Sequence, residues 1–554
     1  MIAATALLAF LLGVQVMVPF AIGLPLVLTL ACASRRLRRG MPRLFAVAPV
    51  PALLCALFDN DGTQFVLGND AFALHFAVDA PGSMLLGVAA LLWIFSGLYA
   101  ARFLRGRPGP DGFVVCWLMT LTGCVGVLLA ADLVGFYFLL AVLSVGASGL
   151  VLQGEGEPAL RAGALYLGLA LLAETFLLAG LILMANAMPD GSLLIRDAAA
   201  ALPASPTRDL TLSLLLIGLG MKAGLVPLHF WMPLAYGAAP IPAAAAMSGA
   251  VVKASVLAMV RFLPLDTALP DFGLPLATVG LFGALYGVLI GITQTHPKVV
   301  LAYSSVSQMG FVAAVIGMGL AAGDASTPMA AAFYAAHHLL VKGSLFLAVG
   351  VIGLTGRRHL WPMLVPAAII ALGLGGLPLT GGSLAKYAAK DLLGSGLAGS
   401  VAVVSSVAST LLMIHFLRRL AQDTASNDAA RAPGMLRFAW LVMALASLAV
   451  PWLLYGEFPV DSLPRALAPA ALWDALWPVL VGALLAVALD RLGGRGLRIP
   501  AGDIGIALGG LRGASLAAGA GLEHTDTFLR RWPVACIALL AVTLFFVWAF
   551  SAGG

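Results

Sequence analysis

The chain has 554 residues, of which 61% are hydrophobic and only 10% are charged, and its mean hydropathy is +1.02. This composition excludes a soluble globular protein and a disordered chain. The five cysteines are scattered and are typical of small apolar residues in helices, which excludes a disulfide-rich secreted scaffold. Apolar runs of about 20 residues recur from end to end. The sequence therefore predicts a polytopic, all-α membrane protein.

The apolar runs predict sixteen membrane spans. The first run is much longer than the roughly 7–15 residues of a signal-peptide core and lacks a basic flank, so it is predicted to be a span. In chain order the spans are expected near residues 2–30, 43–58, 81–103, 112–131, 133–152, 159–186, 210–231, 242–263, 274–292, 298–319, 328–353, 362–394, 398–420, 435–455, 469–490 and 532–551. The first fourteen form the expected core, and a Gly- and Arg-rich stretch separates the last two.

The basic residues predict the orientation of the chain. With the N-terminus outside, loops that face the cytoplasm hold most of the 31 Lys and Arg residues, whereas the opposite loops hold only Arg196, Arg208, Arg261 and Arg465. The positive-inside rule therefore predicts a multi-pass protein of a bacterial-type inner membrane with its N-terminus outside. Because topology explains the net charge of +6, no nucleic-acid partner is expected.

Five lysines fall inside predicted spans: Lys222, Lys253, Lys342, Lys386 and Lys390. Each would cost at least about 2.5–3.5 kcal/mol at the centre of a lipid-facing helix. Lys390 lies near a span end beside Asp391, so snorkelling or pairing explains it. Lys222, Lys253 and Lys342 each lie about eleven to fourteen residues into a span, near mid-bilayer, which is too deep for that explanation and favours an ion pathway.

Two spans are predicted to be broken helices. Residues 210–241 are interrupted just after Lys222, and residues 362–394 just before Lys386, by Gly224, Pro227, Pro233, Gly375, Gly376, Pro378, Gly381 and Gly382. These are the seventh and twelfth spans, so they run in opposite directions, as an inverted repeat of five helices requires. Unwound backbone at membrane depth is tolerated only inside protein or beside water. A hydrated site is expected at each break; the alternative is that Gly and Pro merely kink packed helices.

Other polar groups inside spans extend the pathway. His338 and Lys342 lie four residues apart on one helical face, and an imidazole that titrates near neutrality can pass protons. Glu174 is the one carboxylate centred in a span and is the expected partner of Lys222; a fixed structural ion pair is the alternative. His415 is a relay step or a local hydrogen-bonding group. The candidate proton pathway comprises Lys222, Lys253, His338, Lys342, Lys386, Glu174, His229 and His337.

Sequence motifs for a catalytic centre are absent. There is no Walker loop, no GxGxxG opening a soluble βαβ unit, no CxxC pair and no metal-spaced His/Cys cluster. No cofactor, metal or redox centre of its own is expected, so the energy for transport would come from an ion gradient or from partner subunits. Whether the chain is part of a redox enzyme stays open.

Five segments match one family in order. GMKAGLVPLHFWMPLAYGAAPI, PAAAAMSGAVVKASVLAMVRF, TQTHPKVVLAYSSVSQMGF, HHLLVKGSLFLAVG and GLPLTGGSLAK resemble the antiporter-like subunits of respiratory complex I, Mrp-type Na+/H+ antiporters and membrane-bound hydrogenases. The resemblance covers residues 1–455 and is strong from 210 to 394. It implies a fourteen-helix core with two inverted five-helix repeats, each holding a half-channel. The expected organisation is an N-terminal three-helix segment (1–110), a first repeat (111–263), a second repeat (274–420) and C-terminal helices with a short cytoplasmic connector (435–554).

The resemblance also implies roles for the buried groups. Lys222 and Lys386 would be the lysines of the two broken helices, Lys253 the bridging lysine of the eighth span, and His338 with Lys342 the relay of the eleventh. Lysines at both 253 and 386 resemble the Mrp D subunit, or the complex I subunit nearest the quinone module, more than the distal complex I subunits. In its motifs as a whole the chain is most similar to the Mrp D subunit type.

The fifth span departs from the family pattern. The position of the family glutamate, counted from Asp132, is Ala141. Three explanations stay open: Glu174 substitutes for it, the first half-channel has different coupling, or the subunit no longer pumps.

Three functions are compatible with these residues. The first is a subunit that moves H+, with or without exchange for Na+, alongside other membrane subunits and a soluble redox module. The second is a proton-conducting subunit of an inorganic-carbon accumulating complex with a cytosolic zinc protein similar to carbonic anhydrase. The third is a non-pumping structural membrane arm, in which the buried lysines would tolerate apolar substitution. Ser304, Ser305 and Ser307 are candidate Na+ ligands without a decisive arrangement.

Overall fold

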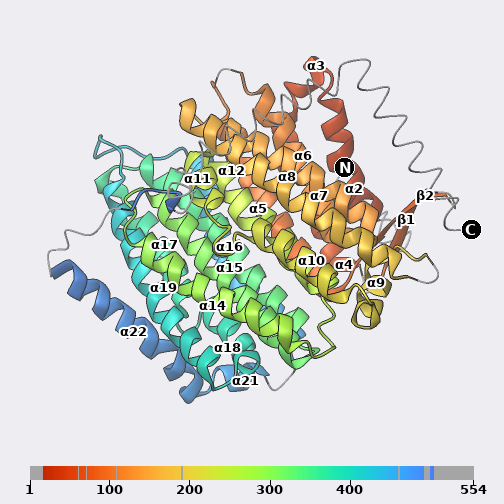
Figure 1. Cartoon of the computed structure of the whole chain (residues 1–554). Coiled ribbons are helices and arrows are strands. Elements are labelled where there is room, and N and C mark those ends of the chain that lie inside the picture. The colour runs from red at the N-terminus through yellow and green to blue at the C-terminus, as the bar shows by residue number, and fades with distance from the viewer. Residues whose placement is uncertain are drawn as a thin grey trace, which may run out of the picture. The chain divides into compact units, whose positions relative to one another are not determined.

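The apolar segments fold as helices, because a helix satisfies its own backbone N–H and C=O groups where no water is present. A computed structural model describes residues 17–59, 62–69, 72–107, 109–188, 191–459, 462–491 and 499–503. The chain forms two compact units, residues 1–501 and 502–554, and every element named here belongs to the first. Its long helices lie roughly parallel or antiparallel to one another (Figure 1).

The elements follow one another in a simple order. The first part contains α2 (Met17–Ala31), α3 (Arg35–Arg38), η2 (Met41–Leu44), α4 (Val50–Phe58), β1 (Gln64–Asn69), β2 (Phe72–Ala77), α5 (Ala80–Phe103), α6 (Asp111–Leu129), α7 (Leu133–Leu152), α8 (Gly156–Asn186), α9 (Ile195–Ala201), η3 (Leu202–Ala204), α10 (Arg208–Ala223), α11 (Trp231–Ala238), α12 (Ile241–Ala246), η4 (Met247–Val251) and α13 (Lys253–Phe262). The second part contains α14 (Pro270–Gly291), α15 (Pro297–Ala322), α16 (Thr327–Gly353), η5 (Arg357–His359), α17 (Trp361–Gly375), α18 (Gly381–Leu393), α19 (Leu397–Gln422), α20 (Gly434–Leu454), η6 (Tyr455–Glu457), α21 (Ser462–Ala466) and α22 (Pro469–Arg491).

Within the described residues, 11 helices are long and apolar enough to cross a membrane, and α2 and α17 are shorter apolar helices. The helix found within residues 43–58 is shorter than the span expected there. Only the nine residues of α4 form an α-helix there, because Pro42 and Pro49 cannot donate backbone hydrogen bonds and interrupt the apolar run. The count of fourteen core spans stays a prediction, and the span expected at 532–551 lies outside the described residues.

A β-hairpin departs from the purely helical prediction. Strands β1 and β2 pair antiparallel, with Phe65 opposite Phe76. The hairpin is tied to α7, because the backbone N–H of His75 donates to Asp132 Oδ2 (2.7 Å) while the other carboxylate oxygen of Asp132 caps the helix at Gly135 (2.7 Å). The hairpin was not predicted because its two short alternating segments lie between longer apolar runs.

Both expected helix breaks are present. Helix α10 ends at Gly224, which has φ 72°, and α17 ends at Gly376, which has φ 102°. Only glycine adopts these left-handed conformations at little cost, which explains why each helix stops there. The chain resumes as α11 after the first break and as α18 after the second.

Three helices in the middle of the described unit are almost completely enclosed. The apolar stretch of α15 is 100% buried, that of α16 is 94% buried, and that of the α12–η4–α13 segment is 89% buried. A polar side chain within these apolar stretches therefore lies mostly inside protein. By contrast α22 is only 22% buried and packs along α19 at the edge of the helices (Figure 1).

Candidate functional site

The lysine at the first break is held by two side chains. Lys222 Nζ lies 2.7 Å from Glu174 Oε1 on α8 and donates to Ser144 Oγ on α7, also at 2.7 Å. The side chains of Lys222 and Glu174 are 11% and 5% exposed, so this is a buried ion pair. The α7 residue that contacts the lysine is therefore Ser144, about one helical turn beyond Ala141.

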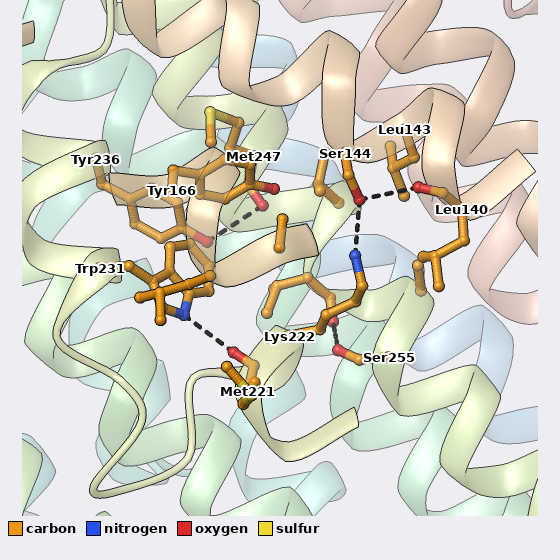
Figure 2. A pocket seen from close by; sticks show the side chains of 15 residues that line it. Leu140, Leu143, Ser144, Tyr166, Met221, Lys222, Trp231, Tyr236, Met247 and Ser255 are labelled. Carbon is orange, nitrogen blue, oxygen red and sulfur yellow. Dashed lines mark hydrogen bonds between the residues drawn. The ribbon is translucent and has the colours of Figure 1, made fainter. Parts of the chain in front are cut away.

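A small cavity lies beside this lysine. Its volume is about 30 Å³, and Lys222, Ser144, Trp231 and Tyr236 contribute to its lining (Figure 2). That is enough room for about one water molecule, and polar groups are present to hold it. The lining also includes Met247, which opens the π-helical turn η4. The cavity therefore borders both Lys222 and the segment that carries the next lysine.

Lys253 directly follows the π-helical turn and contacts a histidine. Its Nζ donates to the carbonyl of Ser248 (2.9 Å) and lies 2.7 Å from His338 Nδ1 on α16. Both side chains are 0% exposed. The turn is widened, since the N–H of Val252 bonds Met247 five residues earlier, and such π turns recur at functional sites. When the lysine is charged, Nδ1 of this histidine is the acceptor.

Lys342 continues the series along α16. It lies one turn beyond His338, is 0% exposed, and donates to the carbonyl of Leu301 on α15 (2.9 Å). Among the described residues no carboxylate forms an ion pair with Lys253 or Lys342. Both lysines are held by neutral groups, so either protonation state has partners in place.

His337 connects α16 to the second break. Its ring is 3% exposed, and neither ring nitrogen has a hydrogen-bond partner in the described part of the chain. The ring packs on the start of α18, since a Cβ added to Gly381 would lie 2.8 Å from Nδ1 and one added to Gly382 would lie 3.1 Å from Nε2. The two adjacent histidines thus face different neighbours.

The lysine at the second break is held differently. Lys386 Nζ donates to the carbonyl of Gly375 and to Ser406 Oγ, both at 2.7 Å. A cavity of about 380 Å³ runs from this lysine to Lys390 at the exposed end of α18. Lys390 lies near the span end and forms an ion pair, as expected, but its partner is Asp474 on α22 (3.0 Å) rather than the adjacent Asp391, because residues on different helices meet here.

Two further histidines lie apart from the lysines in the contacts that the structure shows. His229 is 0% exposed and packs edge-on against Tyr286 of α14, with 5.2 Å between ring centroids. His415 Nε2 lies 2.7 Å from the carbonyl of Gln294. Their roles as relay steps stay predictions.

Apart from Glu174, which was expected beside Lys222, sequence reasoning missed the serines and backbone carbonyls that hold the lysines. Ser144 and Ser406 are hydroxyl side chains in otherwise apolar spans, which is a signal that could have been followed, although each span holds other hydroxyls as well. The carbonyls of Ser248, Leu301 and Gly375 carry no sequence signal at all. Within the described ranges, no cluster of three or more His, Cys, Asp or Glu side chains could hold a metal ion.

Comparisons with known proteins agree on one family. The family model "NADH:quinone oxidoreductase/Mrp antiporter, TM" matches residues 130–414. NADH-quinone oxidoreductase subunit N of Desulforudis audaxviator is 32% identical over 418 residues, which is 70% of this chain and 81% of that protein. The D subunit of the Na(+)/H(+) antiporter of Alkalihalophilus pseudofirmus is 26% identical over 356 residues, covering 60% of this chain and 70% of the relative.

The fold has a solved counterpart. A chain in the structure of the Mrp complex from Dietzia sp. DQ12-45-1b superimposes with a TM-score of 0.68 at 21% identity, covering 86% of this chain and 99% of the other. These relatives are subunits of multi-subunit membrane complexes. The protein is therefore an antiporter-like, multi-pass membrane subunit, and the chain belongs to the NADH:quinone oxidoreductase/Mrp antiporter transmembrane family.

Proposed function

We propose that this chain is the H+-translocating subunit of a multi-subunit membrane complex, and that the protons move along its buried lysines and histidines. The observation that carries the proposal is the direct contact between Lys253 and His338 (2.7 Å), two side chains that are 0% exposed on almost completely enclosed helices. A buried lysine beside a buried histidine has no structural advantage over apolar packing. It does provide two adjacent sites between which a proton can pass.

The remaining groups extend this pair toward both breaks. On one side the cavity beside Lys222 reaches the π-helical turn before Lys253. On the other side Lys342 follows His338 by one turn, and His337 contacts the start of the helix that carries Lys386. Direct contacts do not join all the groups, so the route also needs water, for which the two cavities provide room beside Lys222 and Lys386.

The chemistry of the relay follows from the ion pair at the first break. A carboxylate close to Lys222 favours the charged lysine, and separating the pair favours release of its proton. Glu174 occupies the role that the family glutamate would have at position 141. Formation and breakage of this pair would therefore pass a proton into or out of the central lysines.

The ion in this proposal is H+ rather than Na+. Two of the three serines considered as Na+ ligands are engaged elsewhere: Ser305 shares a hydrogen bond with Ser248 (3.0 Å), and Ser307 donates to the carbonyl of Ala284 (2.6 Å). Sodium would need several oxygen ligands around one point. Lysine and histidine, which line this route, exchange protons and repel metal cations when charged.

The proposal includes the orientation and the partners. With the N-terminus outside, α18 runs from mid-membrane to the outer face, so the cavity at Lys386 would be the outlet. Other membrane subunits would supply the coupling, because the chain has no recognisable energy-converting motif.

Transport in vesicles that contain the assembled complex tests the relay. A potassium diffusion potential would drive H+ uptake, read by a pH-sensitive dye inside the vesicles. We expect Lys253→Met to lower the uptake rate at least about tenfold, because methionine carries no titratable proton. The matched control is Lys298→Met, which removes a lysine that donates to the carbonyl of Ala239 (2.9 Å) outside the series.

Uptake at the unmodified rate with Lys253→Met, in a protein that assembles normally, would overturn the relay and favour a structural membrane arm. Mass spectrometry of the complex purified in mild detergent distinguishes a pumping subunit from an inorganic-carbon complex. Redox or antiporter subunits support the proposal, whereas a single large soluble zinc protein would identify an inorganic-carbon complex.

A further inference from the structure

Helix α22 lies beyond the core expected for the family, yet it forms one wall of the cavity at Lys386. The cavity of about 380 Å³ is lined from α18 by Lys386 and Lys390, and from α22 by Asp474, Trp477 and Pro478. Exposed residues at the end of α18 line the same cavity, so it opens to the surface at that end.

The helix is held closely against the core. A Cβ added to Gly482 of α22 would lie 2.6 Å from the carbonyl of Val407 and 2.7 Å from Thr410 Cβ, so the backbones of α22 and α19 approach closely. Thr410 lies one turn from Ser406, which binds the Lys386 ammonium. Toward its other end α22 is held by Arg418, which lies 3.6 Å from Asp490. The wall is therefore a fixed part of the described unit.

The mouth of the cavity carries two opposite charges. Lys390 Nζ donates to Asp474 Oδ2 at 3.0 Å, and the two side chains are 58% and 57% exposed. An ion pair this exposed contributes little to stability, so it can open and close at small cost. Its electrostatic effect is local: Asp474 neutralises a lysine that would otherwise repel any cation passing between Lys386 and the surface.

We propose that Asp474 of α22 sets the charge at the mouth of this cavity, and that the Lys390–Asp474 pair controls the access of cations to Lys386. The inference rests on the proposed function for its role in H+ transport. The charge of the mouth is a property of the cavity and can be measured without transport.

Thiol labelling inside the cavity measures that charge. Ser383 lines the cavity one turn before Lys386, and Ser383→Cys would place a thiol there. The full-length protein in lipid nanodiscs is treated with methanethiosulfonate reagents of similar size, one cationic and one anionic, and labelling of this peptide is followed by mass spectrometry. The ratio of the two rates cancels any change in ionisation of the thiol itself.

We expect Asp474→Asn to lower the cationic-to-anionic ratio roughly fivefold, because a unit positive charge is left at the mouth in largely aqueous surroundings. Lys390→Gln should raise the ratio by a similar factor, and the double variant should return close to the starting ratio. The matched control is Asp490→Asn, which removes an ion pair of α22 with the core ~24 Å further along the helix.

A ratio unchanged by Asp474→Asn, or changed equally by Asp490→Asn, would overturn the proposal. Failure of the proposed function gives a different result: the ratio shifts as expected while H+ uptake by the complex is insensitive to Lys386→Met. If the relay and the role of the Lys390–Asp474 pair are both correct, Asp474→Asn should also slow H+ uptake severalfold, and Asp490→Asn should not.

Discussion

Both broken helices end at a glycine in the left-handed conformation, but the two breaks hold their lysines in different ways. At the first break the lysine precedes the glycine, pairs with Glu174, and lies beside a cavity of only about 30 Å³. At the second break the lysine follows the glycine, binds a carbonyl and a hydroxyl, and lies in a cavity of about 380 Å³ that reaches the surface.

The backbone carbonyls at the ends of α10 and α17 show the same contrast. In the first break the carbonyl of Met221 accepts from the indole N–H of Trp231 (3.0 Å), whereas in the second the carbonyl of Gly375 accepts from Lys386 itself (2.7 Å). One lysine is stabilised by a counter-charge and the other by dipoles and access to water. Similar helix breaks therefore create two sites with different requirements for releasing a proton.

Removing each lysine should reveal this difference most strongly. We expect Lys222→Met to lower the free energy of unfolding by about 3–5 kcal/mol, since it leaves the Glu174 carboxylate buried without a cation. Lys386→Met should cost only about 1–2 kcal/mol, because its partners are neutral and water can replace it. Steric trapping in bicelles measures the free energy of unfolding of both variants. The double variant Lys222→Met, Glu174→Leu should recover most of the unfolding free energy lost in Lys222→Met. Equal losses in Lys222→Met and Lys386→Met would contradict the difference between the two breaks.

The glycines test how tightly each break is packed. A Cβ at Gly382 would clash with the carbonyl of Gly373 and approach His337, so Gly382→Ala should cost about 2–3 kcal/mol. At the first break a Cβ on Gly220 would meet only Leu225, at 3.6 Å. Gly220→Ala should be neutral or stabilising by up to about 1 kcal/mol. Thermal unfolding of both variants in one detergent checks the order, and the reverse order would show that the first break is the tighter one.

The serines test how much each lysine depends on its hydroxyl partner. Ser406→Ala should cost about 1 kcal/mol, because it removes the one side-chain partner that the described residues provide for Lys386. Ser144→Ala should cost roughly 0.5 kcal/mol, since Glu174 still holds Lys222. Thermal unfolding in the same detergent compares the stability of Ser406→Ala and Ser144→Ala. A larger loss with Ser144→Ala would mean that the ion pair does not dominate at the first break.

The indole at the first break should have the smallest effect. Trp231→Phe removes the hydrogen bond to Met221 but keeps the ring packed against Tyr166 (5.0 Å between centroids), so we expect about 0.5 kcal/mol. Tyr236→Phe, which removes a longer bond to the carbonyl of Met247 (3.4 Å) in the same cavity, is the control and should cost less. The backbone N–H of Gly224 also donates to this carbonyl (3.2 Å), so a loss well above about 1 kcal/mol for Trp231→Phe would show that this second bond does not compensate.

Several features of the site were predictable because their causes are local in sequence. The helix breaks follow from glycines and prolines, and the His338–Lys342 spacing places both groups on one helical face. The pairing of Glu174 with Lys222 was expected because few carboxylates lie within apolar spans. The actual partner of Lys390 was not predictable for the opposite reason: Asp474 is 84 residues away along the chain, and only the packing of α22 along α19 brings it close to Lys390.

The sequence by itself determined that this is a membrane protein, where its helices break, and which titratable groups lie inside it, because hydropathy, backbone conformation and charge are properties of single residues and short segments. The tertiary structure alone decided which groups meet. It placed His338 on Lys253, gave one break a carboxylate and the other an open cavity, and put α22 at the mouth. Those outcomes depend on how helices distant in the chain pack, and a local pattern carries no information about the distance between them.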